Sequence, residues 1–138
     1  MSVEVQVLGW AAVLLVVQLV ALAIAANLQV GPARLMGPRD EGIRLTGVAG
    51  RLQRALQNHL ESLVLFTVAV LLHALPAQAE TAAAGLTAPA ALVYLAARAF
   101  YVPAYAFALS PWRSLIWGVG FLATLVVLVE GLLLAVRP

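Results

Sequence analysis

Four long apolar segments, separated by short polar breaks, make up most of this chain of 138 residues. A bilayer core about 30 Å thick is crossed by about 20 helical residues, and each segment reaches that length. The hydrophobic share of 64% exceeds the share of about half found in soluble domains. We therefore predict a single all-α membrane domain, a bundle of four transmembrane helices over residues of about 5–28, 48–73, 82–109 and 114–136.

The longest polar break, about residues 29–47, is rich in glycine and proline and contains Arg34, Arg39 and Arg44. Loops this long inside a compact domain are usually functional. Loops between membrane helices that are shorter than about 60 residues and rich in arginine stay on the cytoplasmic side. We therefore expect this loop and the turn at Arg113 to be cytoplasmic. Both ends of the chain, and the turn that contains Glu80, are then expected on the other side of the membrane.

The second apolar segment begins with polar residues that share one helix face. They stand at positions i, i+3, i+7 and i+10, within an arc of about 80° on a helix: Arg51, Arg54, Asn58 and Glu61. A charged side chain near the bilayer centre costs roughly 2.5–3.5 kcal/mol. This stripe must therefore face protein, water or a polar ligand.

The third segment carries a second polar stripe at positions i, i+4, i+7 and i+11: Tyr94, Arg98, Tyr101 and Tyr105. Arg98 lies deep in a membrane helix and needs a partner, and Glu61 is expected at a similar depth. We predict that Glu61 pairs with Arg98 or receives an amine of a ligand. Pro89 and Pro103 are both predicted to bend this helix, because each removes a backbone hydrogen bond.

Four further polar residues of the apolar segments are given structural roles. Gln18, at mid-membrane, is predicted to make a hydrogen bond between helices. His59 lies about 120° around the helix from the polar stripe, so we predict a packing or interfacial role and not catalysis. His73 and Glu130 fall near the outer ends of their helices and are predicted to pair with each other.

In the half of the helix bundle that is predicted to lie nearer the cytoplasm, positive charges outnumber negative ones. The arginines are Arg51, Arg54, Arg98 and Arg113, and the one acidic residue is Glu61. This excess favours an anionic ligand whose carboxylates accept bidentate arginine contacts, beside a bilayer that supplies a lipophilic second substrate. The chain has no cysteine, so any thiol must arrive with a substrate. We predict no metal site, and no nucleic-acid binding because an extended basic surface is lacking.

Three motifs together resemble the MAPEG superfamily, the membrane-associated proteins of eicosanoid and glutathione metabolism. They are Arg51-x-x-Arg54-Ala-x-x-Asn58-x-x-Glu61 followed by Phe66, Arg98-x-x-Tyr101-x-x-x-Tyr105, and Arg113-Ser114. The similarity covers nearly the whole chain, including the four helices and the long first loop. Tyr101 stands where some eicosanoid-forming members have histidine, so the pattern is closer to the general, bacterial-type members.

The resemblance implies a homotrimer in a bacterial inner membrane, with glutathione as cosubstrate bound between subunits near the cytoplasmic face. The implied activity is a glutathione transferase or peroxidase that acts on lipophilic small molecules, either electrophiles or hydroperoxides, that enter from the membrane lipids. Arg113 or Ser114 would lie near the sulfur, where Arg113 would lower the pKa of the thiol or Ser114 would donate a hydrogen bond to the thiolate. The residues implied to hold glutathione are Arg54, Asn58, Glu61, Arg98, Tyr101 and Tyr105, with Arg51 at the edge of the binding site and Arg34 contributed by the neighbouring subunit.

Two other functions stay open from the sequence. A small four-helix cation transporter would need a carboxylate inside the first helix, which has only Glu4 at its start, and efflux from vesicles would reveal it. A non-catalytic member of the same superfamily would use the basic pocket for an anionic lipid headgroup or another small carboxylate. Mass spectrometry of co-purifying small molecules distinguishes that case.

Overall fold

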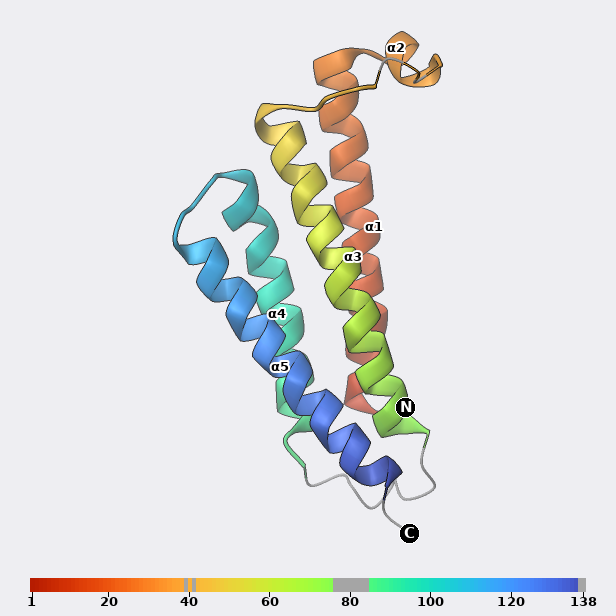
Figure 1. Cartoon of the computed structure of the whole chain (residues 1–138), viewed down its shortest axis with the longest axis vertical. Coiled ribbons are helices and arrows are strands. Elements are labelled where there is room, and N and C mark those ends of the chain that lie inside the picture. The colour runs from red at the N-terminus through yellow and green to blue at the C-terminus, as the bar shows by residue number, and fades with distance from the viewer. Residues whose placement is uncertain (39, 41, 76–84, 137–138) are drawn as a thin grey trace.

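The structure, a computed structural model, describes residues 1–38, 40, 42–75 and 85–136. All regular structure in these ranges is helical: α1 (Val3–Val30), α2 (Pro32–Met36), α3 (Gly47–Ala74), α4 (Thr87–Ala106) and α5 (Trp112–Ala135). The long helices run alternately in opposite directions, so α2 and the α4–α5 turn lie at one end of the bundle (Figure 1). The start of α1 and the end of α5 lie at the other. The long loop and the Arg113 turn therefore lie at the same end of the bundle. That this end faces the cytoplasm stays a prediction.

Three of the described helices, α1, α3 and α5, are long and apolar enough to cross a membrane. Large apolar side chains stand exposed along all three, among them Trp10, Val64 and Leu122. Such a surface suits contact with lipid or with another subunit. The remaining long helix, α4, has 20 residues but carries Arg98 and three tyrosines, which make it more polar. The prediction of four membrane helices is therefore supported for three.

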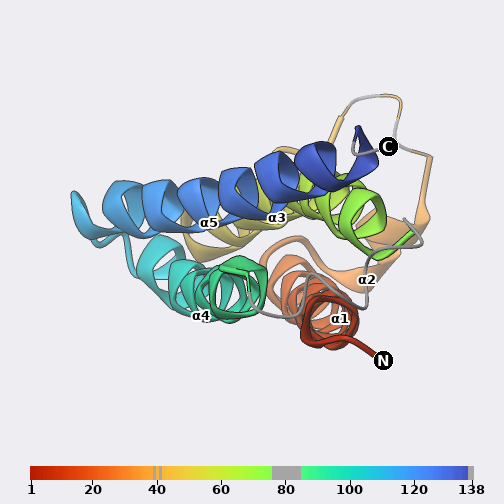
Figure 2. The ribbon, with the colours of Figure 1, turned by 90° about the horizontal axis from the view of Figure 1, so that it is seen from below.

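The core lies where the four long helices meet around Phe66 of α3 and Tyr94 of α4. Both side chains are completely buried, and their rings stack with centroids 3.9 Å apart. Val7 from α1 and Val127 from α5 complete this cluster. Viewed from below, α3 and α5 form one layer of the bundle and α1 and α4 the other (Figure 2). Small residues allow the close approach of these helices, as is common in membrane bundles.

A buried hydrogen bond joins α1 to α3 at mid-bundle. Nε2 of Gln18 lies 2.6 Å from Nδ1 of His59, and both side chains are almost fully buried. This confirms the predicted interhelical hydrogen bond of Gln18 and the packing role of His59. A polar pair held inside apolar surroundings fixes the register of the two helices, because any slip would leave buried polar groups unpaired.

The start of α4 differs from the prediction. The helix begins at Thr87, after Gly85 and Leu86, and not at about residue 82, although residues 82–84 lie outside the described ranges. Pro89 is thus the third residue of α4, where a backbone N–H has no acceptor inside the helix. The predicted bend at Pro89 is wrong for this reason, whereas Pro103 does lie inside the helix.

The end of α4 also comes earlier than the predicted residue 109. The Leu109 N–H donates to the Ala104 carbonyl at 2.9 Å, and the Ala108 N–H donates to the Tyr105 carbonyl at 3.1 Å. This pair of bonds is the Schellman arrangement, which closes a helix with a left-handed residue. That residue is Ala108, with φ 57°. The helix stops at Ala106 although the sequence offers no glycine as a signal.

Replacing Ala108 by glycine is expected to stabilise the protein. A left-handed backbone brings the Cβ of an L-residue close to its own chain and costs roughly 1–2 kcal/mol, while glycine's freedom in the unfolded chain offsets part of the gain. We expect a net gain of about 0.5–1 kcal/mol, measured as a higher thermal midpoint in detergent. Ala99→Gly, at an exposed position inside the helix, is the control and should lower the midpoint. A lower midpoint in Ala108→Gly would contradict the assigned backbone.

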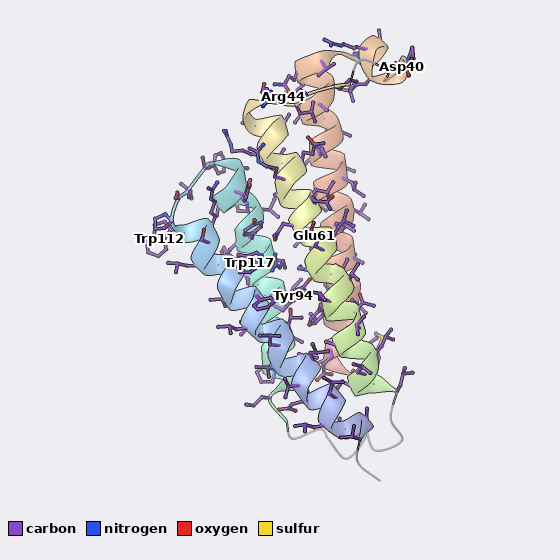
Figure 3. All side chains as sticks on the ribbon, in the orientation of Figure 1. Asp40, Arg44, Glu61, Tyr94, Trp112 and Trp117 are labelled. Atoms are coloured by element: carbon purple, nitrogen blue, oxygen red, sulfur yellow. The ribbon has the colours of Figure 1, made fainter. Side chains whose placement is uncertain are left out.

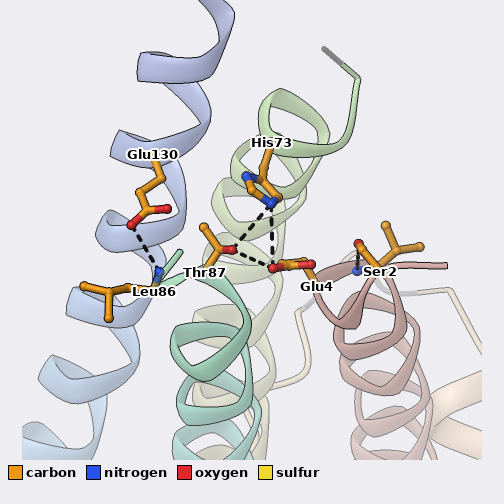
Figure 4. Close-up of polar contacts among 7 residues, drawn as sticks. Ser2, Glu4, His73, Leu86, Thr87 and Glu130 are labelled. Carbon is orange, nitrogen blue, oxygen red and sulfur yellow. Dashed lines mark hydrogen bonds and ion pairs between the residues drawn. The ribbon is translucent and has the colours of Figure 1, made fainter. Parts of the chain in front are cut away.

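The other end of the bundle holds a buried polar cluster of Glu4, His73 and Thr87, one residue from each of α1, α3 and α4 (Figure 4). The Thr87 hydroxyl donates to the Glu4 carboxylate at 2.6 Å, and His73 Nε2 lies 3.7 Å from the same carboxylate oxygen. The predicted pairing of His73 with Glu130 is wrong. Glu130 instead accepts from the Leu86 N–H at 3.3 Å, where it satisfies an otherwise free donor at the start of α4.

Replacing Glu4 by leucine is expected to destabilise the bundle, because the Thr87 hydroxyl and the His73 ring would lose their buried acceptor. We expect a loss of about 1–3 kcal/mol, seen as a lower thermal midpoint in detergent. Glu4→Gln keeps an oxygen that accepts from Thr87 and should retain most of the stability. Equal losses in the two variants would show that the hydrogen bond contributes nothing.

Candidate functional site

The polar stripes of α3 and α4 meet beside the first turns of α5, with Arg98 at their centre. Arg98 is only 2% exposed. Its Nη1 donates to Oδ1 of Asn58 at 2.8 Å, and its guanidinium carbon lies 5.5 Å from the ring centroids of both Tyr94 and Tyr101. Its Nε has no hydrogen-bond partner among the described residues. Tyrosine rings and one amide oxygen thus surround a buried cation that no described carboxylate neutralises.

The prediction that Glu61 pairs with Arg98 is wrong. Within the described part of the chain, no ion pair joins them within 4.0 Å. Glu61 is exposed and accepts a hydrogen bond from Nε2 of Gln57 at 3.0 Å. The Arg98 side chain is held between tyrosine rings, within reach of Asn58. Glu61 lies almost one helical turn further along α3, so it remains available to a ligand.

Gly120 of α5 makes room for the Arg98 head group. A Cβ at this position would lie 3.1 Å from Nη2 of Arg98 and 3.3 Å from the Cβ of Ala97. Both separations are shorter than ordinary contacts between packed atoms. The absence of a side chain at Gly120 therefore lets α5 pack directly against the arginine.

Two cavities open beside Arg98 on the face shared by α3 and α5. The first, of about 250 Å³, is polar and is lined by Asn58, Tyr101, Tyr105, Arg113, Ser114 and Trp117. The second, of about 120 Å³, is lined by Asn58, Glu61, Ser62, Leu65, Arg98, Trp117, Phe121 and Thr124. Asn58 and Trp117 belong to both cavities and form the boundary between them. Figure 3 shows Glu61 on α3 and Trp117 on α5 within this region.

Tyr105 brings two more arginines to the polar cavity. The guanidinium carbon of Arg113 lies 5.1 Å from the centroid of the Tyr105 ring, and that of Arg54 lies 6.0 Å from it. Cations within about 6 Å of an aromatic centroid are attracted to the ring face. Arg113 and Ser114 also belong to the first turn of α5, where the helix dipole adds partial positive charge. The electrostatics of this cavity therefore favour an anion.

The structure brings most of the residues expected from the sequence to this site. Asn58, Tyr101, Tyr105, Arg113 and Ser114 line one cavity, Glu61 and Arg98 line the other, and Arg54 lies beside Tyr105. Three of the expected residues line neither cavity: Arg54, which lies near the Tyr105 ring, and Arg34 and Arg51. Arg34 is exposed on α2, and Arg51 is bonded to the end of α4.

Sequence reasoning missed Trp117, Ser62 and Thr124. Trp117 lies four residues after Arg113, and Ser62 four residues after Asn58, so helical spacing would have placed both on the faces already identified. The Ser62 hydroxyl lies 3.0 Å from the Tyr94 hydroxyl, which holds the edge of the second cavity. Thr124 follows Gly120 by one turn and bonds to its carbonyl at 3.0 Å.

A larger groove of about 460 Å³ lies on the opposite side of the α4–α5 contact. Its lining is apolar, including Val93, Phe100, Leu109 and Ile116, with Trp112 toward the turn. Among the described residues that line it, none is charged and could orient a polar ligand. The two cavities beside Arg98 are therefore the candidate site.

The arrangement has defined chemical capabilities. Arg54, Arg98 and Arg113 can bind carboxylates, Asn58 and the tyrosines can hydrogen-bond to amides, and Glu61 can receive an ammonium group. Positive charge fixed beside a cavity also stabilises an anion that forms there during a reaction. In the described residues no group of three or more His, Cys, Asp or Glu side chains could hold a metal ion.

Comparison with known proteins identifies the family. The model of the MAPEG family matches residues 7–133, which is nearly the whole chain. No curated protein and no solved structure gave a match. The match includes all of α3 and α4, with both polar stripes, and most of α1 and α5. Together with the three apolar helices that are long enough to cross a bilayer, it establishes that this chain is an integral membrane protein of the MAPEG family.

Proposed function

We propose that the protein binds glutathione in the two cavities beside Arg98 and activates its thiol. The thiol would then be conjugated to lipophilic electrophiles, or would reduce lipophilic hydroperoxides. Membership of the MAPEG family suggests a role of the glutathione or eicosanoid type at the membrane. The specific transferase or peroxidase activity is our inference from the site.

The observation that carries the proposal is the unneutralised charge of Arg98. A guanidinium that is 2% exposed would normally be paired with a carboxylate. Within the described ranges, however, Arg98 has one amide oxygen as its hydrogen-bond partner and a free Nε. Arg54 and Arg113 add further positive charge nearby. Because buried charges in membranes are costly, an anionic ligand is the natural source of the missing counter-charge.

Glutathione fits this set of groups. It offers two carboxylates to the arginines, an ammonium group to Glu61, two amides to Asn58 and the tyrosines, and a thiol. The thiolate form carries an excess of negative charge that matches the excess of arginine over Glu61 at the site. We assign the sulfur to the end of the polar cavity that Arg113 and Ser114 line.

The proposed chemistry begins with loss of the thiol proton to water, favoured by the charge of Arg113 and a hydrogen bond from Ser114. For an electrophile, the thiolate forms the S–C bond while the leaving group departs with the electron pair. For a hydroperoxide, sulfur attacks oxygen and the O–O bond breaks to give an alcohol and a sulfenate. A second glutathione then attacks the sulfenate sulfur and, with the proton released in the first step, gives the disulfide and water. Lipophilic substrates would enter from the bilayer.

We further propose that the active protein is a homotrimer and that α4 is its fourth membrane-spanning helix. In this assembly Arg34 of a neighbouring subunit would reach the site, since within one chain Arg34 is exposed on α2 and lines neither cavity. The end of the bundle that carries α2 and the Arg113 turn would face the cytoplasm, in agreement with its arginines. Both chain ends would lie on the other side, in a bacterial inner membrane.

The test is a pair of measurements on protein purified in detergent. Calorimetry with glutathione and with its analogue that has alcohol in place of thiol should give saturable binding of both. Conjugation of an aryl halide and reduction of an alkyl hydroperoxide should occur with glutathione and not with the alcohol analogue. A protein that binds neither peptide and carries only phospholipid would overturn the proposal in favour of a lipid-binding role. Cation efflux from vesicles would instead support a transporter.

A further inference from the structure

Arg51 contacts the end of another helix and not the candidate site. It lies in the second turn of α3, and its Nε donates to the backbone carbonyl of Ala106 at 2.7 Å. Ala106 is the last residue of α4. Arg51 is half-buried and lines neither of the two cavities. An arginine at the carboxyl end of a helix also interacts favourably with the helix dipole.

The contact completes the hydrogen bonding at the end of α4. The last four carbonyls of a helix have no partner within it. Here the turn residues Phe107, Ala108 and Leu109 donate their N–H groups to the carbonyls of Pro103, Tyr105 and Ala104, respectively. The fourth carbonyl, that of Ala106, is the one that Arg51 occupies. The turn thus satisfies three carbonyls by itself and depends on α3 for the last.

The same turn leads directly into the proposed catalytic end of α5. The Arg113 N–H donates to the Leu109 carbonyl at 3.0 Å, so Leu109, whose N–H caps α4, also accepts a hydrogen bond from the first turn of α5. The guanidinium of Arg113 rests on the ring of Tyr105, the residue before Ala106. The turn contains Ala108 in a strained left-handed conformation, which needs support from its surroundings.

We propose that Arg51 is a positioning residue: it clamps the last carbonyl of α4 and thereby holds Arg113 over the polar cavity, without touching glutathione. This rests on the proposed function, and it replaces the place at the edge of the glutathione site that the family resemblance implied for Arg51. Misplacement of a catalytic group by about 1 Å is enough to lower a rate by up to about a hundredfold, so a remote clamp has a measurable effect.

The experiment uses Arg51→Met, which keeps the aliphatic stem and removes the guanidinium. The control is Arg44→Met, which removes an exposed arginine from the preceding loop. We expect amide exchange over residues 107–113 of the glutathione-free protein to rise about tenfold in Arg51→Met and to stay unchanged in the control. With glutathione, the affinity should change little while the thiolate signal and kcat fall about tenfold.

Two results would overturn the clamp: exchange over residues 107–113 that is the same as in the wild type, or a loss of glutathione affinity with kcat preserved. If Arg51→Met fails to fold, the comparison is made in an Ala108→Gly background, where the turn carries less strain. Failure of the proposed function is a separate result. A wild-type protein that does not bind glutathione would contradict that function, while the exchange measurement would still decide the role of Arg51.

Discussion

Arg113→Ala is expected to remove most of the glutathione thiolate from the protein and to lower kcat/KM roughly 10²–10³-fold. The reason is its place on the Tyr105 ring at the edge of the polar cavity, next to Ser114 in the first turn of α5. A cation there stabilises the thiolate more than the thiol. The measurement is the ultraviolet absorbance of the thiolate, followed by steady-state rates with an electrophile.

Two variants separate the possible causes of that loss. Arg113→Lys keeps the charge but lacks the planar guanidinium, so it should retain part of the thiolate signal. Ser114→Ala removes only a hydroxyl and tests whether a hydrogen bond to sulfur contributes. Full thiolate formation in Arg113→Ala, together with its loss in Ser114→Ala, would show that the hydroxyl and not the arginine activates the thiol.

Arg98→Met is expected to weaken glutathione binding about 30-fold or more, because truncating one partner of a buried charged contact typically costs 2–5 kcal/mol. The variant removes the proposed counter-charge for a carboxylate and leaves Oδ1 of Asn58 without its donor. Titration calorimetry with glutathione measures the effect. Arg44→Met controls for the loss of one positive charge at the same end of the protein.

Gly120→Ala offers an independent check on the same group. Its Cβ would lie 3.1 Å from Nη2 of Arg98, so the guanidinium must shift without any change in its charge. We expect weaker glutathione binding than in the wild type but stronger binding than in Arg98→Met. Wild-type affinity in Arg98→Met would mean that the arginine serves only to join α3, α4 and α5.

Much of the fold could be predicted because the apolar segments are long, and because the polar residues of the second and third segments each share one helix face. Periodicity placed Asn58, Arg98, Tyr101 and Tyr105 correctly on their faces, and the structure brings those faces together. The short helix α2 was not predicted. Its five residues give no periodic signal, although Pro32 at its first position is a common helix start.

The errors came from features that depend on contacts between helices. Counting residues from a helix end gave Glu61 and Arg98 similar depths, but it could not show that the tyrosine rings direct Arg98 to Asn58. Glu4 was treated as the polar start of the chain, and yet it is buried against His73 and Thr87. The helix end at Ala106 was missed because an alanine takes the left-handed position where glycine is usual.

The most direct test of the central claim is an ultraviolet difference spectrum of the purified protein titrated with glutathione near neutral pH. The account predicts a saturable thiolate signal in the wild type, its loss in Arg113→Ala, and a shift of the titration to higher glutathione concentrations in Arg98→Met. Binding without a thiolate signal would contradict the proposed activation of the thiol. The absence of any binding would contradict the assignment of glutathione to this site.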